Sequence, residues 1–135
     1  MRKKILLLLF SILSFGTNSF AQYHKDILGE NFIQQTIQMP DDYEGKVIIT
    51  IIRKEAAHPT TKAILYVHGF NDYFFQKSLA EHFNDAGFNF YAVDLRKYGR
   101  SMLSNQYPFQ VHNLNEYFAD IDTTLQIIKQ EGNHE

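Results

Sequence analysis

The stretch AILYVHGFND, residues 63–72, carries five apolar residues that run without alternation into a His-Gly turn. Such an unbroken run predicts a strand that is buried on both faces, as in a parallel sheet covered by helices. A helical pattern follows, so the chain changes here from a strand to a helix. Ligands of α/β sheets bind outside the carboxyl ends of the strands. The turn is therefore the first place in the sequence where we expect a functional site.

The segment after this turn predicts a helix followed by a second buried strand. Apolar residues recur at helical spacing up to Ala86, Asp72 is a candidate N-cap, and Gly87 is a candidate left-handed C-cap. Residues 88–93 form the next apolar run, which Asp94 closes. The order strand, helix, strand predicts a right-handed crossover and therefore a parallel pair of strands.

The segments before the quoted stretch predict two further strands. Residues 31–39 alternate loosely and indicate an edge strand, whereas residues 46–53 are rich in β-branched side chains. Between them, residues 40–45 gather proline, acidic residues and glycine in one turn. Residues 54–61 form a loop that leads into the quoted stretch. These signals predict a hairpin at the edge of the sheet.

The last part of the sequence predicts an irregular segment and one more helix. Residues 95–112 show no sustained period, whereas apolar residues return at helical spacing over residues 114–128. Asn113 or Asn115 is the candidate N-cap of this helix. No strand follows the helix to complete the sheet, so we expect the sequence to be the N-terminal half of a larger fold.

Two motifs, in this order, resemble those of the α/β-hydrolase superfamily. The first is the His-Gly-Phe turn at residues 68–70. The second is DLRKYGRS at residues 94–101, where the similar proteins carry Asp-x-x-Gly-x-Gly-x-Ser. Lys97 occupies a position where glycine is usual, whereas Gly99 is retained. The chain resembles in particular the monoacylglycerol lipases, lysophospholipases and serine aminopeptidase-like hydrolases, and the resemblance covers residues 32–128.

The resemblance implies an α/β fold: the N-terminal part of an α/β-hydrolase domain, with an edge hairpin and parallel strands joined by crossover helices, truncated before the nucleophile elbow. It also implies a mechanism in which a Ser on a G-x-S-x-G elbow, an acid and a His follow one another along the chain. None of these three residues is expected in this sequence. Ser101 lies in a near match that lacks the second glycine and follows the wrong strand, so it is interpreted as a loop residue.

The resemblance places the backbone N–H of Phe70 in an oxyanion hole, in a turn shared with Gly69 and His68. Such a hole needs hydrogen-bond donors that are fixed before the reaction starts. At Gly69 a side chain would crowd the substrate oxygen or forbid the required dihedral angles. His68 precedes any nucleophile in the chain, so we expect it to brace the turn through hydrogen bonds. The ring of Phe70 is left free to line an apolar acyl site.

Five further residues are expected to structure the loops around this turn. Asn71 and Asp72 would hold the loop through their short polar side chains, and helix capping is the preferred role for Asp72. Asp94 and Arg96 are interpreted as a structural pair that fixes the loop after the second buried strand. Gly99 is a further loop-structuring residue.

The remaining candidates point to packing rather than to a metal or a cofactor. Residues 73–75 are all aromatic, and they are expected to pack in the core, with a substrate wall as the alternative. The other histidines show no metal-ligand spacing, and no HExxH pattern occurs. We therefore expect neither a metal nor a cofactor.

Residues 1–21 predict a secretory signal peptide. A basic start and an apolar run from Ile5 to Phe15 precede Ser19-Phe20-Ala21, a sequence typical of a cleavage site. The run is too short for a membrane anchor, which needs ~20 apolar residues, so no stable membrane span is expected. Residues 22–135 would form the mature chain, which is the N-terminal portion of the hydrolase domain, and its location would be secreted or periplasmic.

The mature chain would hold 10 basic against 15 acidic residues, a net charge of −5. No basic stripe is present, so a nucleic-acid partner is not expected. The partner that the resemblance implies is a small-molecule or lipid ester substrate of the full-length protein. The sequence contains no cysteine, so its stability must come from a packed core rather than from disulfides.

Two classes of function are compatible with these features. The first is a secreted serine hydrolase of carboxylic esters such as monoacylglycerols or lysophospholipids, with small peptide amides as rival substrates, of which this chain is an inactive part. The second is a non-catalytic binding module that keeps the floor of the cleft. A G-x-S-x-G motif encoded in frame after residue 135 would favour the first class, and a stop codon would favour the second.

Overall fold

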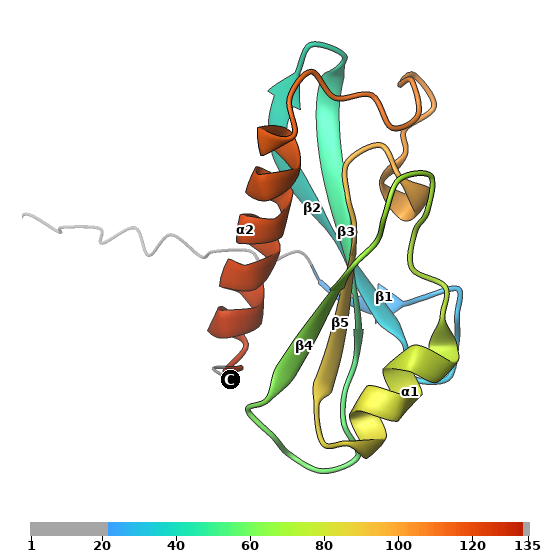
Figure 1. Cartoon of the computed structure of the whole chain (residues 1–135), viewed down its shortest axis with the longest axis vertical. Helices are drawn as coiled ribbons and strands as arrows, with labels where there is room; N and C mark the ends of the chain where they lie inside the picture. Colours follow the sequence, from blue (N-terminus) through green and yellow to red (C-terminus); the bar gives the residue numbers. More distant parts are fainter. Residues whose placement is uncertain (1–21, 134–135) are drawn as a thin grey trace, which may run out of the picture.

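A computed structural model describes residues 22–133, and the predicted signal peptide lies outside the described residues. Five strands form one mixed sheet in the order β1-β2-β3-β5-β4. The strands are β1 (His24–Lys25), β2 (Ile33–Asp42), β3 (Gly45–Lys54), β4 (Ala63–Val67) and β5 (Asn89–Asp94). The helices are α1 (Lys77–Asp85), the short 3-10 helix η1 (Gly99–Ser101) and α2 (Asn115–Gln130). Figure 1 shows α1 and α2 on opposite sides of the sheet.

The sheet combines an antiparallel hairpin with a parallel pair. Strands β2 and β3 pair in antiparallel fashion, and β3 continues the sheet by pairing antiparallel with β5. Strand β4 pairs parallel with β5, which confirms the predicted parallel pair. The hairpin turn is tighter than predicted, because Pro40 and Asp41 belong to β2 and only Tyr43 and Glu44 separate the two strands. The register shifts between Met39 and Asp42, an irregularity of the kind that tolerates a proline in a strand.

The core lies on both faces of the sheet because side chains alternate along each strand. Phe90 and Ala92 of β5 pack towards α1, in a cluster that also contains Phe74. Tyr91 and Val93 of the same strand pack on the other face, in the clusters to which α2 contributes. Every residue of β5 is buried, because α1 packs on one face of this strand and α2 packs on the other.

The prediction that the quoted apolar strand is buried on both faces is wrong for the described chain. Residues Ala63 to Tyr66 of β4 are half-buried, and Val67 is exposed. Within residues 22–133, β4 pairs only with β5, so its second edge has no neighbouring strand to cover it. Strand β4 is apolar as expected, but the deeply buried strand of the parallel pair is β5.

The start of α1 differs from the prediction, whereas the start of α2 follows one of the two predicted caps. Helix α1 begins at Lys77, five residues after the expected cap Asp72, and no side chain caps it. At α2 the Oδ1 of Asn113 accepts the Asn115 amide at 2.9 Å, and Glu116 Oε1 accepts the Asn113 amide at 3.1 Å. Leu114 directly precedes α2 and makes no side-chain capping bond, so this reciprocal pair lies one residue before the helix end and resembles a capping box.

The end of α1 follows the prediction, because Gly87 adopts a left-handed φ of 85° directly after the helix. The amide of Phe88 donates to the carbonyl of Phe83, as in a Schellman motif. In the part of the chain that the structure describes, neither helix has the length and apolar character needed to cross a bilayer.

Candidate functional site

The turn after β4 is held against the end of β5 by the ring of His68. Its Nε2 accepts the backbone N–H of Leu95 at 3.1 Å, so the proton must lie on Nδ1. From there Nδ1 donates to the carbonyl of Gly69 at 2.8 Å. The ring is buried and packs on Tyr98, with the ring centroids 4.6 Å apart. Both ring nitrogens are therefore used in bracing the turn, as the position of His68 in the sequence predicted.

The next two residues of the turn are open to solvent. A Cβ added at Gly69 would meet no atom within 4 Å, and Gly69 does not adopt a positive φ. The predicted need for glycine dihedral angles is therefore wrong, and the crowding of a substrate oxygen stays a prediction. Phe70 is 80% exposed. Within residues 22–133 its backbone N–H makes no hydrogen bond, so this donor is available to a ligand.

Asn71 and Asp72 complete the turn. Asn71 adopts a left-handed φ of 54°, a conformation that asparagine tolerates better than most residues. Asp72 accepts the amide of Tyr73 at 2.8 Å and the hydroxyl of Tyr66 at 3.3 Å. Its carboxylate thus holds the loop rather than a helix. The helix starts later because Phe74, two residues after Asp72, is drawn into the core and is fully buried.

The three aromatic residues after the turn do not act as one cluster. Phe74 packs in the core, with its ring centroid 5.1 Å from that of Phe90. Tyr73 and Phe75 are 42% and 52% exposed, and their rings lie 5.4 Å apart. Core packing is therefore confirmed for the middle residue only.

Beneath the turn, Arg100 joins the carboxylates of Asp26 and Asp94. Its Nε lies 2.7 Å from Asp26 Oδ2, and its Nη1 lies 2.9 Å from Asp94 Oδ2. The guanidinium also donates to the carbonyl of Phe74 at 2.9 Å, and Asp94 Oδ1 accepts the Phe74 amide at 3.0 Å. Burial disfavours a charged guanidinium, but the two carboxylates outweigh it and raise the pKa of Arg100.

The predicted pairing of Asp94 with Arg96 is wrong, because Arg96 points to α2 instead. Its Nη2 lies 2.7 Å from Asp120 Oδ1, and its Nη1 lies 3.2 Å from Glu116 Oε2. Both residues still structure the loop, but each has its own partner. The Arg96–Asp120 pair is buried and anchors α2 on the loop after β5.

Gly99 and Ser101 are fixed by contacts with the same loop. A Cβ at Gly99 would lie 2.6 Å from Asp94 Oδ2 and 2.7 Å from Tyr73 Cβ, and the φ of Gly99 is +43°. Only glycine fits there. Ser101 is fully buried, and its hydroxyl donates to the carbonyl of Asp94 at 2.6 Å. A serine in this setting is a structural residue, which agrees with its interpretation from the sequence.

A hollow of about 410 Å³ opens beside the turn. The rings of Phe70 and Phe109 pack edge to face, with their centroids 5.5 Å apart, and both line the hollow. The residues around the hollow come from the turn, the loop after β5, the segment before α2, and α2 itself. They are His68, Gly69, Phe70, Leu95, Tyr98, Phe109, Val111, Leu114 and Tyr117. Phe70, whose N–H makes no hydrogen bond within residues 22–133, is thus one of the residues that line a mostly apolar hollow.

Sequence reasoning missed the ionic partners of this site and the segment that lines the hollow beside Phe70. Asp26 lies 74 residues before Arg100, and no local pattern links them. Phe109 and Val111 lie in a segment without periodicity, so only their apolar character marked them. For Lys97, the one available signal in the sequence is its departure from the glycine that is usual in the second motif. Within residues 22–133 no three His, Asp or Glu side chains are grouped as a metal ion requires.

The fold and the turn place this chain among the α/β hydrolases. The family described as serine aminopeptidase, S33, an α/β-hydrolase family, matches residues 58–135, which is more than half of the chain. The chain belongs to that family. The match begins before β4 and includes the turn, the loop after β5, and α2. A search among curated proteins found no match to this chain.

Proposed function

We propose that this chain supplies one half of the oxyanion hole and part of the acyl site of a secreted serine hydrolase that cleaves carboxylic esters. The observation that carries the proposal is the free N–H of Phe70, one of the residues that line the apolar hollow. A donor in this position can hydrogen-bond to the oxyanion that forms when an ester carbonyl is attacked. Monoacylglycerols and lysophospholipids combine such a carbonyl with an apolar chain that suits the hollow.

The reaction would follow the double displacement of serine hydrolases. A serine Oγ attacks the ester carbonyl carbon while a histidine takes its proton, and the oxyanion forms opposite the N–H of Phe70. Collapse of the tetrahedral intermediate releases the alcohol, which receives the proton from histidine, and leaves an acyl-enzyme. Water then repeats the sequence and releases the acid. Residues 1–135 contain no G-x-S-x-G motif, so serine, acid and histidine would come from sequence beyond Glu135.

An amide hydrolase is the second candidate, and the family match favours it, because the family is described as a serine aminopeptidase. The same oxyanion hole serves an amide carbonyl, with an amine as the leaving group. An aminopeptidase must also bind a free α-ammonium group. Within residues 22–133 the hollow beside Phe70 is lined mostly by apolar side chains and by no carboxylate, which favours an acyl chain.

The decisive experiment measures hydrolysis by the full-length protein. We expect turnover of nitrophenyl esters to exceed that of aminoacyl nitroanilides, and we expect a fluorophosphonate probe to label one serine outside residues 1–135. Higher turnover of the nitroanilides would favour the aminopeptidase. Absence of all hydrolysis and labelling would refute the proposal and favour a binding module.

The secreted location is tested separately. The basic start, the apolar run and the small residues before Gln22 support cleavage after Ala21. Intact mass analysis of exported protein should therefore give a chain that begins at Gln22. Exported protein that retains residues 1–21 would contradict the location and the cleavage site together.

A further inference from the structure

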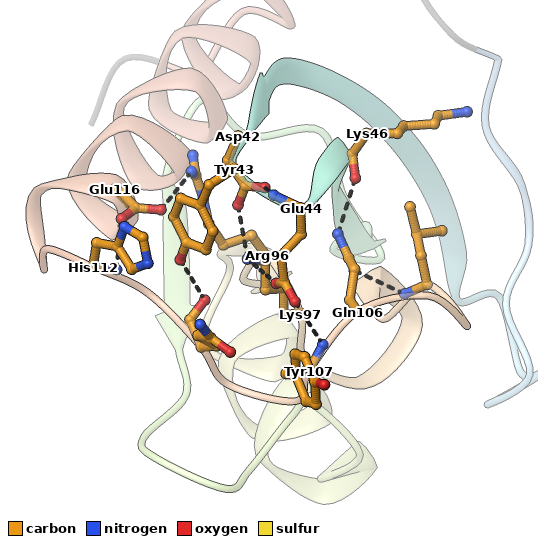
Figure 2. A network of polar contacts seen from close by, with 12 residues as sticks. Asp42, Tyr43, Glu44, Lys46, Arg96, Lys97, Gln106, Tyr107, His112 and Glu116 are labelled. Atoms are coloured by element: carbon orange, nitrogen blue, oxygen red, sulfur yellow. Dashed lines mark hydrogen bonds and ion pairs between the residues drawn. The ribbon is translucent and has the colours of Figure 1, made fainter.

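The outer wall of the hollow is held by the tip of the β2–β3 hairpin. We call residues 42–46 the hairpin tip and residues 103–112 the wall loop, which carries Phe109 and Val111 into the hollow. Figure 2 shows the hairpin tip and the wall loop joined by several polar contacts. The two segments are more than 50 residues apart in the sequence, so these contacts are made only in the folded chain.

Two of the contacts use polar groups of the hairpin tip as acceptors. The Oε1 of Glu44 accepts the backbone N–H of Tyr107 at 3.0 Å. The carbonyl of Lys46 accepts the side-chain amide of Gln106 at 2.9 Å. In both cases the hairpin tip satisfies a donor of the wall loop, which has no regular secondary structure of its own.

Tyr43 adds two contacts nearer to α2. Its hydroxyl donates to the carbonyl of Gln110 at 3.1 Å. Its ring stacks on the imidazole of His112, with a centroid distance of 3.5 Å and an interplanar angle of 5°. Together with Glu44 and Lys46, Tyr43 fixes the wall loop at both ends of the segment that carries Phe109.

Lys97 joins the hairpin tip to the loop after β5. Its side chain is fully buried, and its Nζ lies 2.7 Å from Asp42 Oδ2 and 2.5 Å from Glu44 Oε2. The ammonium also lies 4.4 Å from the centroid of the Tyr43 ring, within the range of a cation–π interaction. Lys97 thus contacts Asp42, Tyr43 and Glu44 of the hairpin tip (Figure 2).

The backbone of Lys97 contacts the wall loop directly. Its carbonyl accepts the N–H of Phe109 at 3.2 Å, and its φ is +63°. Residues other than glycine avoid this conformation, and they keep it only where their surroundings over-determine it. The contacts of the side chain with the hairpin tip supply that restraint. A lysine here therefore couples the position of Phe109 to the hairpin tip, which a glycine could not do.

Lys97 and the carboxylates of Asp42 and Glu44 stabilise one another's charged forms. Burial alone would lower the pKa of Lys97, but the carboxylates of Asp42 and Glu44, which form ion pairs with its Nζ, outweigh burial and raise that pKa. The ion pair with Lys97 lowers the pKa of Glu44. All three groups are therefore charged near neutral pH, and the cluster stays closed.

We propose that Lys97 is a positioning residue of the substrate site: it ties the hairpin tip to the wall loop and so sets the position of the Phe109 ring beside Phe70. The two rings pack edge to face and line the hollow together, so the position of Phe109 shapes this side of the hollow and hence the acyl groups that fit. The assignment rests on the proposed function, because it assumes that the hollow receives the acyl group.

The test compares Lys97→Met with Lys46→Met in the full-length protein. Methionine keeps the bulk of the lysine stem at residue 97 and removes the ammonium. Lys46 is the matched control, because it lies in the hairpin tip but its side chain is exposed and points away from the cluster (Figure 2). Lys97→Gly is the second variant, since glycine accepts the positive φ if the methionine variant does not fold.

Two readouts separate this inference from the proposed function. Hydrogen exchange of peptides from the wall loop reports whether Lys97 holds it, and needs no activity. We expect exchange about tenfold faster in Lys97→Met and unchanged in Lys46→Met. Turnover of acetyl and octanoyl nitrophenyl esters reports the width of the hollow. We expect the ratio of their kcat/KM values to change by about tenfold, while kcat for the acetyl ester stays within about twofold.

Each possible result of the exchange and turnover measurements either supports or overturns the role of Lys97. Unchanged exchange in the wall loop would show that Lys97 does not hold it and would overturn the inference. Faster exchange with an unchanged ester ratio would show that the wall loop is held but does not select the acyl group, which would also overturn it. If wild-type protein hydrolyses neither ester, the proposed function fails and the substrate role of Lys97 fails with it, while the exchange result still decides whether Lys97 holds the loop.

Discussion

Arg100 and Lys97 lie three residues apart, and each is a largely buried cation between two carboxylates. They differ in what the carboxylates are attached to. The partners of Arg100, Asp26 and Asp94, have fully buried side chains beneath the turn. The partners of Lys97 belong to the hairpin tip, and their side chains retain some exposure, 8% and 12%.

This difference divides the site into a side held by fully buried ion pairs, the turn with Phe70, and a side held by partly exposed ion pairs, the wall loop with Phe109. Arg100 also donates to the carbonyl of Phe74, so buried ionic contacts hold the segment that follows the turn with Phe70. The wall loop is held from outside, by a hairpin tip that solvent can reach. We therefore expect changes at Arg100 to affect stability most, and changes at Lys97 to affect the shape of the hollow.

The largest effect is expected for Arg100→Met. The substitution leaves the carboxylates of Asp26 and Asp94 buried without their cation, and removing one partner of a buried ion pair typically costs about 3–5 kcal/mol. The measurement is the free energy of unfolding of the full-length protein by denaturant. Lys62→Met, at an exposed lysine, is the control and should change it by less than about 0.5 kcal/mol. A loss below about 1 kcal/mol for Arg100→Met would remove the distinction between the two halves.

Gly99→Ala should have the next largest effect. Its Cβ would be forced against Asp94 and Tyr73, and overpacking together with the positive φ should cost about 2–4 kcal/mol. Gly87→Ala is the matched control, since Gly87 has a φ of +85° but open space around it. It should lose only the conformational part, about 1–2 kcal/mol. Equal losses for the two variants would show that close packing under the turn is unimportant.

Acid should weaken the hairpin cluster specifically. The pKa of Glu44 in the folded protein is lowered by Lys97, so its contribution to stability is present above the unfolded-state pKa of about 4.3 and is lost as pH falls through the lower folded-state pKa. The pKa of Asp42 is lowered as well, although burial opposes the shift. The difference in unfolding free energy between wild type and Lys97→Met should therefore be largest at pH 7 and shrink at pH 3. A difference that stays constant across this range would contradict the ionic link.

The smallest effect is expected for Ser101→Ala. The variant loses the hydrogen bond from the hydroxyl to the carbonyl of Asp94, which should cost about 1 kcal/mol of stability. Turnover should stay within about twofold of wild type, because the buried hydroxyl cannot reach a substrate. Labelling of Ser101 by a fluorophosphonate, or loss of turnover in a folded variant, would make Ser101 the nucleophile and contradict its structural role.

The local signals of the sequence predicted the β2–β3 hairpin, strands β4 and β5, the two α-helices and the turn, but neither β1 nor η1. The hairpin, the parallel pair and the end of α1 at Gly87 each depend on residues that are close together in the chain. The start of α1 was misplaced, because the burial of Phe74 overrides the capping preference of Asp72.

The partners of the charged residues could not be read from the sequence in the same way. The sequence favours a pair between Arg96 and its neighbour Asp94, but the partner of Arg96 in the fold is Asp120, 24 residues away. Arg100 pairs with Asp26 across 74 residues. Ion pairs of this kind depend on how the strands and helices pack together. The sequence around a carboxylate therefore does not predict which distant cation it pairs with.

The central claim is that the N–H of Phe70, not its ring, stabilises the oxyanion. Its most direct test is the turnover of a short-chain nitrophenyl ester by full-length wild type, Phe70→Ala and Phe70→Pro. Circular dichroism must show that each protein is folded, because a proline at residue 70 also restricts the backbone of Gly69. Alanine keeps the N–H, so kcat should fall only modestly. Proline removes it, so kcat should fall by about 10²–10³, or about 3–4 kcal/mol. If the folded proline variant turns over as fast as the alanine variant, Phe70 is not an oxyanion donor and the active site does not lie on this turn.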